Sequence, residues 1–319
     1  MKLTLKHKFI SIFSLILISF TLLQSCAPGN EKESFKETNI DKSSEIFSDR
    51  KVNSQTKEYW FDGKAEISSY ELNQIRYGEI HTGIASLIYV TEPFSKSSNT
   101  KADFIKETNI PVLKLNSTKK FNTGIYPYSI MKSTFFPFEK TNTSLKMAFS
   151  MQEWCGMIYT EMTNRNNLIF SQNSYFEGAS YKNKKLTKNT LEDDFWSLIR
   201  LNPELLPQGK QEIIPSMTFL NLTHQELKTY EAISKTTTTS DNFSKTYVIK
   251  YPTLDRTLSI TFEAKFPYKV LSWTESYKSG YGNQRKKLIT TAKLIKSIKI
   301  DYWNKNKNKD SYLRDSLGF

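Results

Sequence analysis

The chain has 319 residues, a formal net charge of +13 and only two cysteines. A basic surface would suit nucleic acid, anionic lipid or acidic glycan. The lysines, however, are spread along the whole chain, and no basic stretch is interleaved with aromatic residues. We therefore expect no nucleic-acid partner, and a solvated lysine surface is the simplest explanation of the charge.

The N-terminus predicts export and lipidation. Three lysines among the first eight residues precede an apolar run over 9–23, and the small Ser25 precedes Cys26. This order is typical of a secretory signal peptide, and the run is shorter than the ~20 residues of a spanning helix. A cysteine directly after the small residue matches the lipobox of bacterial lipoproteins, in which the thiol receives a diacylglyceryl group. We predict a lipoprotein signal peptide over 1–25 and palmitate-type acylation of Cys26; the alternative is an ordinary signal with a chance cysteine.

The next segment, residues 26–58, is polar and carries few large apolar side chains. Such a composition cannot bury enough surface to offset the entropy of ordering. We predict a flexible tether with a reach of ~30 Å, followed by a β-rich domain over 59–319. The polar stretch 234–245 would either divide that domain into two halves or form a hairpin loop.

Alternating apolar and polar residues dominate the rest of the chain. In TLSITFEAKF, the side chains of Leu258, Ile260 and Phe262 share one face, as expected of a half-buried strand. With the runs before and after it, this segment predicts a three-stranded meander. Similar runs predict strands over 65–77, 79–90, 112–115, 129–136, 145–163, 168–176, 212–222 and 288–303.

Two helices are predicted. Residues 190–203, TLEDDFWSLIRLNP, combine an approximate capping box with one apolar stripe and a terminating Asn-Pro. A short helix is expected at 310–319. The fold class is therefore mainly β, an antiparallel curved sheet or open barrel with one main helix and a short C-terminal helix; two packed sheets are the alternative.

The mature chain retains one further cysteine, Cys155, in the sequence QEWCG. A thiol nucleophile needs a lowered pKa, usually from a nearby histidine or a helix N-terminus. Only His81 and His224 remain after signal removal, and no helix follows Cys155. We predict a small core residue in the middle of a strand, with Gly156 allowing a bulge or a close approach.

Two further groups of residues are candidate sites. Arg76, Glu79, His81 and Glu92 could form a polar cluster on neighbouring strands, but no metal-ligand spacing supports a metal site there, and no cofactor is predicted. Aromatic side chains in two predicted loops could form the rim of a site for an apolar ligand or a glycan, or could extend the core. These rim candidates are Tyr126, Tyr128, Phe135, Phe136 and Phe138.

Several motifs occur in an order that resembles one protein family: GKAEISSYEL, RYGEIHTG, FNTGIYPYSIMKSTFFP, QEWCG, SYFEG, TTAKL and LRDSLG. The family is a group of lipoproteins from Bacteroidota without an assigned activity, and the resemblance covers nearly all of residues 58–319. Some members carry the label "septum formation inhibitor Maf". True Maf proteins are cytoplasmic nucleotide pyrophosphatases with an S-x-S-P-R-R loop, which is absent here. The resemblance implies a compartment and a class of organism, and it assigns no catalytic residues.

Together these features predict a lipoprotein of the bacterial cell envelope, anchored by its N-terminal lipid, with the outer membrane favoured. We expect a non-enzymatic protein that binds an apolar or lipid-like ligand, or a partner protein, in the concavity of a curved sheet. The alternative is an envelope hydrolase or transferase that uses Cys155 or the cluster of Glu79, His81 and Glu92.

Overall fold

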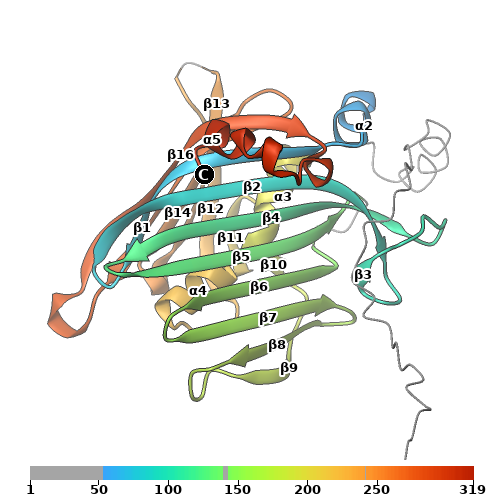
Figure 1. Cartoon of the computed structure of the whole chain (residues 1–319). Helices are drawn as coiled ribbons and strands as arrows, with labels where there is room; N and C mark the ends of the chain where they lie inside the picture. The colour runs from blue at the N-terminus through green and yellow to red at the C-terminus, as the bar shows by residue number, and fades with distance from the viewer. Residues whose placement is uncertain (1–52, 139–142, 241) are drawn as a thin grey trace, which may run out of the picture. The chain divides into compact units, whose positions relative to one another are not determined.

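The computed structural model describes residues 53–138, 143–240 and 242–319 (Figure 1). The strands are β1 (Ala65–Arg76), β2 (Glu79–Ser95), β3 (Thr100–Lys101), β4 (Ile110–Thr123), β5 (Tyr126–Pro137), β6 (Lys146–Glu153), β7 (Gly156–Asn164), β8 (Leu168–Ser174), β9 (Tyr181–Leu186), β10 (Thr190–Leu191), β11 (Gly209–Ile214), β12 (Tyr230–Thr238), β13 (Ser244–Tyr251), β14 (Arg256–Glu263), β15 (Val270–Ser279) and β16 (Lys286–Ile300). The helices are α2 (Ser54–Trp60), α3 (Phe195–Leu201), α4 (Met217–Thr223) and α5 (Tyr312–Leu317).

All sixteen strands belong to one sheet. The first and last long strands, β1 and β16, pair antiparallel at its centre, and one arm extends from each of them. Every pairing is antiparallel except the short parallel contact of β10 with β11. The expectation of a mainly β protein with an antiparallel curved sheet is confirmed, and the sheet does not close.

The two edge strands, β9 and β10, lie close to each other in the chain. Only residues 187–189 connect them, so the edges cannot be more than roughly 14 Å apart at that point. No pairing between β9 and β10 occurs in the described part of the chain. The sheet therefore curves far enough to bring its edges near each other without hydrogen-bonding them.

The interior of the curve is filled by side chains and by two helices. Figure 1 shows α3 and α4 behind the front arm, and both helices contact strands of both arms. From α3, Trp196 packs edge-on against Trp273 of β15, and its carbonyl accepts a hydrogen bond from Tyr89 of β2. From α4, Phe219 packs against Tyr277 of β15. The helices thus hold the two arms around one hydrophobic core.

Alternation explains which face of each strand is buried. In β14, Leu258, Ile260 and Phe262 are at most 3% exposed, while the residues between them are half-buried. The predicted meander is confirmed as β13, β14 and β15. The predicted division at 234–245 falls in the β12–β13 hairpin, through which the sheet continues.

Three local expectations were wrong. The run 212–222 is not one strand, because β11 ends at Ile214 and α4 begins at Met217 after the cap residue Ser216. The run 145–163 is two strands joined by a tight turn. The main helix begins only at Phe195, since residues 192–194 form a 3-10 turn whose carboxylates bind other elements.

The N-terminal predictions lie almost wholly outside the described residues. The signal peptide over 1–25 and Cys26 are among the residues left undescribed. Residues 53–58, the last of the expected tether, are described, and most of them belong to α2. This helix is attached to the core through Trp60, which is 1% exposed. No helix in the described part of the chain is long and apolar enough to cross a membrane.

Candidate functional site

At one end of the sheet, at the left in Figure 1, five hairpin connections belong to the continuous run of strands from β15 to β9. They join β15 to β16, β1 to β2, β4 to β5, β6 to β7 and β8 to β9. Because neighbouring strands are about 4.8 Å apart, the five tips extend over roughly 40 Å. Large apolar side chains are exposed at these tips: Trp154 by 69%, Tyr175 by 77%, Tyr281 by 71% and Ile125 by 84%.

Aromatic rings form a nearly continuous series along this end. Tyr281 stacks on Tyr77 at 6.1 Å between ring centroids, and Tyr77 lies 6.4 Å from Tyr128. Tyr126 then lies 6.0 Å from Tyr128 and 6.2 Å from Trp154. We call the aromatic row the set Tyr77, Tyr126, Tyr128, Trp154, Tyr175 and Tyr281.

Glycines allow the hairpins to approach one another. A Cβ atom on Gly156 would lie 2.9 Å from the ring of Tyr175. The ring can therefore pack on the start of β7 only because residue 156 has no side chain. At the β1–β2 turn, Tyr77 and Gly78 both have positive φ angles of 54° and 79°, which suit a two-residue type I′ turn. A Cβ on Gly78 would lie 3.3 Å from the Cα of Gly280 in the neighbouring hairpin.

Arg76 connects the aromatic row to a cavity beneath it. Its guanidinium lies 4.2 Å from the ring centroid of Tyr77 and 5.4 Å from that of Tyr128, within the range of cation–π attraction. The cavity has a volume of about 80 Å³ and lies between β1, β15, the β15–β16 connection and the end of α4. This end of the sheet therefore combines exposed rings with a basic recess.

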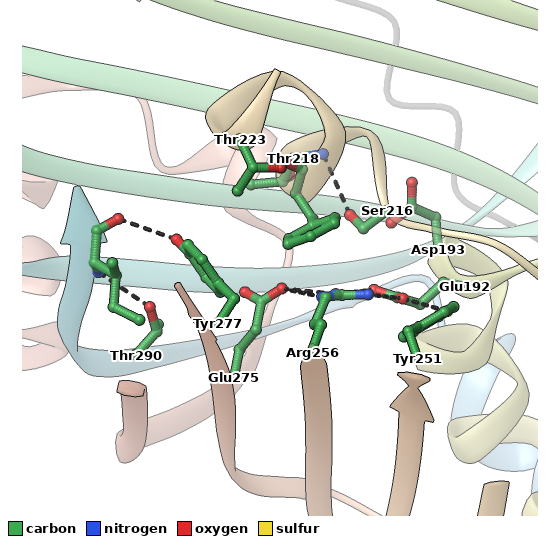
Figure 2. A network of polar contacts seen from close by, with 12 residues as sticks. Glu192, Asp193, Ser216, Thr218, Thr223, Tyr251, Arg256, Glu275, Tyr277 and Thr290 are labelled. Atoms are coloured by element: carbon green, nitrogen blue, oxygen red, sulfur yellow. Dashed lines mark hydrogen bonds and ion pairs between the residues drawn. The ribbon is translucent and has the colours of Figure 1, made fainter. Parts of the chain in front are cut away.

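A second polar group lies deep in the core (Figure 2). Arg256 of β14 binds Glu192 through Nη2 at 2.7 Å and Glu275 through Nε at 2.7 Å. Tyr251 donates a hydrogen bond to Glu192 at 2.6 Å. Arg256 and Glu192 are at most 2% exposed and Glu275 is 7% exposed.

Its neighbours continue this network. Lys132 of β5 forms an ion pair with Asp193, which also accepts a hydrogen bond from the Met217 backbone N–H at 3.1 Å. A cavity of about 30 Å³ beside these groups has room for about two water molecules, far below the ~300–1,000 Å³ of small-molecule sites. We interpret the network as structural: it attaches the 192–194 turn and α4 to strands of both arms.

The structure contradicts the predicted position of Cys155. It lies in the two-residue turn between β6 and β7 and is exposed, rather than buried in the middle of a strand. Its backbone N–H donates to Glu153 at 2.6 Å. A hydrogen bond of the thiol with the same carboxylate, and the negative charge of that carboxylate, raise the pKa of the thiol. A raised pKa disfavours the thiolate that nucleophilic catalysis needs. The expected close approach at Gly156 is present.

The predicted cluster of Glu79, His81 and Glu92 does not form. All three lie on β2, with Glu79 at its start and Glu92 thirteen residues further along, which is roughly 43 Å for an extended strand. Glu92 instead pairs with Lys114 at 3.3 Å. His81 binds the backbone carbonyl of Arg76 at 3.1 Å and packs on a phenylalanine ring. Arg76, Glu79 and His81 therefore lie near one another at the β1–β2 turn, but Glu92 is far from them.

Four of the five predicted rim residues lie on one strand, β5, rather than in two loops. Tyr126 and Tyr128 lie at the aromatic end of β5, while Phe135 and Phe136 lie at its other end and Phe138 follows it. Tyr128, Phe136 and Phe138 are at most 1% exposed and belong to the core. A single rim made of all five is therefore wrong, although Tyr126 and Tyr128 do contribute to the aromatic row.

Sequence reasoning missed most of the aromatic row. Tyr77, Trp154, Tyr175 and Tyr281 come from four different hairpins, and the topology that places them at one end is not visible in a one-dimensional pattern. A usable signal was present for three of them, since Tyr77 and Tyr281 lie beside a glycine and Tyr175 lies beside a serine. In the described part of the chain, no three His, Cys, Asp or Glu side chains converge as metal ligands would.

Comparisons with known proteins add little. No family model matches the chain, and no curated protein matches it. Among solved structures, a porin-like protein from Bacteroides uniformis aligns with 72% of this chain and 95% of its own, at 7% sequence identity and a TM-score of 0.24. A similarity of this strength carries no argument about function.

Proposed function

We propose that this protein is a lipid-anchored, non-enzymatic lipoprotein of the bacterial cell envelope that binds a partner protein through its aromatic row. The row carries the proposal, because three hairpins present the exposed rings of Trp154, Tyr175 and Tyr281 at one end of the sheet, and the other rings of the row connect Trp154 to Tyr281. Tyrosine, tryptophan and arginine are enriched at protein interfaces and supply most of their strongest contacts. A row roughly 40 Å long has the dimension of such an interface.

An engulfed lipid-like ligand is the weaker form of the binding hypothesis. The two cavities described above, about 30 and 80 Å³, are both much smaller than a site for a lipid chain requires. Core side chains of both arms and of the two helices pack inside the curve of the sheet. A partner that docks on the outside of the hairpins needs no such cavity.

The position at which the described chain begins favours an orientation in which the aromatic row points away from the anchor. Residue 53 and α2 lie beside the first residues of β1, at the opposite end of the sheet from the hairpin tips of the aromatic row. If residues 26–52 lead to a lipid on Cys26, the chain enters the folded part away from the aromatic row. The row would then be accessible to other envelope proteins.

The anchor is tested by labelling cells with radioactive palmitate. The proposal expects label in the wild-type protein and its recovery with membranes, whereas Cys26→Ser should lose both. Cys155→Ser is the matched control, because it removes the other cysteine and should leave labelling unchanged. An unprocessed, unlabelled wild-type chain recovered from the cytosol would contradict the proposal.

The binding surface is tested by photo-cross-linking in cells. A photoreactive phenylalanine at position 154 should yield a discrete cross-linked protein. The same residue at position 104 is the control, because Phe104 is similarly exposed, at 73%, but lies at the opposite end of the sheet. The assignment is supported if Tyr281→Ala reduces the cross-link from position 154, and it fails if both positions give the same products.

A further inference from the structure

The cavity of about 80 Å³ beneath the aromatic row is basic. Arg76, Lys278 and Arg285 are among the residues that line it, and no aspartate or glutamate is. Its volume is several times the ~10–15 Å³ that one water needs, so a small polyatomic group fits. Tyr77 and Tyr281 belong to both the cavity wall and the aromatic row.

Arg76 is a buried cation without a counterion in the described part of the chain. It is 9% exposed, and its hydrogen bonds all go to uncharged acceptors. Nε donates to the Tyr128 hydroxyl at 3.2 Å, Nη2 to the Tyr77 hydroxyl at 3.3 Å, and Nη1 to the Leu222 carbonyl. These bonds use three of the five N–H donors of a guanidinium, which stays charged under all ordinary conditions. A buried charge that lacks a counterion is costly to the fold.

A structural role accounts for part of this arrangement. Leu222 belongs to the last turn of α4, and a cation beside a helix C-terminus is stabilised by the exposed carbonyl groups. That interaction involves only the partial negative charge of the carbonyl groups at the helix end, whereas burying a guanidinium removes a full positive charge from water. The C-terminus of a two-turn helix therefore does not replace a full negative charge.

The other basic groups add to the positive potential. Arg285 is exposed and forms no ion pair within the described residues; its Nη2 donates to the Lys278 carbonyl at 3.4 Å. Lys278 pairs with Asp255 at 3.4 Å, outside the cavity lining. Burial and the charge of Arg76 lower the pKa of His224, which also lines the cavity.

We propose that this cavity binds a small oxyanionic group, a carboxylate or phosphate, that neutralises Arg76. Guanidinium groups match the planar, bidentate geometry of such anions. The inference rests on the proposed function, because it names the chemistry that a partner protein presents beside the aromatic row: an acidic side chain or a C-terminal carboxylate. Rings of the row would contact the partner while the anion enters the cavity.

His224 provides a direct readout. An anion bound beside it stabilises the imidazolium, so its pKa should rise. The full-length protein, purified from membranes in a non-ionic detergent, is titrated with sodium phosphate and with sodium acetate, each against sodium chloride at equal ionic strength. The ring signals are followed by NMR over pH 5 to 8, and His81→Gln identifies the signal of His224.

Matched arginine variants separate site binding from surface charge. With Arg285→Ala, the dissociation constant of the anion, measured from the shift of the His224 signal, should rise at least about tenfold. Arg285→Lys should retain most of the affinity. Arg165→Ala removes the same charge from the turn at the other end of β7 and should change nothing. A shift that is equal in chloride, or equal in the Arg285→Ala and Arg165→Ala variants, would overturn the proposal.

A third experiment identifies the source of the anion. Micelles that contain phosphatidylglycerol are compared with micelles of phosphatidylcholine. A shift that only phosphatidylglycerol produces would support the anion site and contradict a partner protein as its source. If none of the probes moves the His224 signal, the anion site is refuted, and the cross-link from position 154 still decides the proposed function independently.

Discussion

Glu66 and Arg200 form a bidentate ion pair in the core, with Nη1–Oε1 at 2.6 Å and Nη2–Oε2 at 2.7 Å. Both side chains are 1% exposed. Arg200 also lies over the rings of Trp60 and Tyr89, and Tyr59 donates a further hydrogen bond to Glu66. The pair therefore attaches α3 and α2 to β1, where the two arms of the sheet meet.

Breaking this pair should be strongly destabilising. Glu66→Gln leaves the guanidinium of Arg200 buried without its charge partner, which should lower the free energy of unfolding by about 3–5 kcal/mol. The measurement is urea unfolding followed by circular dichroism. Glu231→Gln is the control, because Glu231 pairs with Lys210 at the surface, and such pairs contribute less than about 1 kcal/mol.

The double variant Glu66→Gln/Arg200→Met tests whether the two residues act as a unit. Removing both charges avoids an unpaired buried ion, so its cost should be smaller than the sum of the two single substitutions. Equal losses of stability in Glu66→Gln and Glu231→Gln would contradict the importance of the pair.

Asp194 should make the protein less stable as the pH rises from about 4 to 7. Burial raises the pKa of this carboxyl to about 7, although the hydroxyl and backbone N–H of Ser144 bind it. The unfolded chain has the ordinary value near 3.9. The folded state therefore binds more protons in this range, and the stability that the protonated group contributes is full below about pH 4 and is lost as the pH passes 7.

Asp194→Asn tests this expectation because it keeps the shape and an acceptor oxygen but cannot ionise. The free energy of unfolding of the variant minus that of wild type should increase between about pH 4 and 7 and level off above pH 7. Comparing the two proteins at each pH cancels other titrating groups, including Glu66. A difference that stays constant across this range would refute the raised pKa.

Cys155 should react with iodoacetamide in the native protein but slowly at neutral pH. The thiol is exposed, and Glu153 raises its pKa, so the reactive thiolate is scarce at pH 7. Glu153→Gln should increase the labelling rate, whereas Glu161→Gln, a change on the same hairpin beyond the turn, should not. Mass spectrometry measures the rate, and a native thiol that is protected until the protein is denatured would contradict its placement in the turn.

The sequence specified the fold class better than it specified the site. Alternation of Leu258, Ile260 and Phe262 predicted β14 because each strand has one buried face. The segment 145–163 was predicted as one strand because Trp154 and Cys155 carry none of the glycine or proline signals that usually identify a turn. Alternation alone also could not tell that Glu79 and Glu92 lie on one long strand rather than on neighbours.

The site depends on contacts between distant parts of the chain, which explains why it was harder to predict. Tyr77 and Tyr281 are about two hundred residues apart, yet their rings lie 6.1 Å apart because β1 and β16 pair at the centre of the sheet. The buried acids at 192–194 lie in the segment that was predicted as the start of the main helix. Their partners, Lys132, Ser144 and Arg256, come from elements that no local pattern connects to them.

The central claim is that the aromatic row is the binding surface, and the affinity of the cross-linked partner tests it most directly. Once the protein captured from position 154 is identified and purified, its dissociation constant is measured with wild type, Trp154→Ala, Tyr281→Ala and Phe104→Ala. The account predicts that Trp154→Ala and Tyr281→Ala each weaken binding by roughly tenfold or more, while Phe104→Ala binds like wild type. Equal affinities for all four proteins would contradict it.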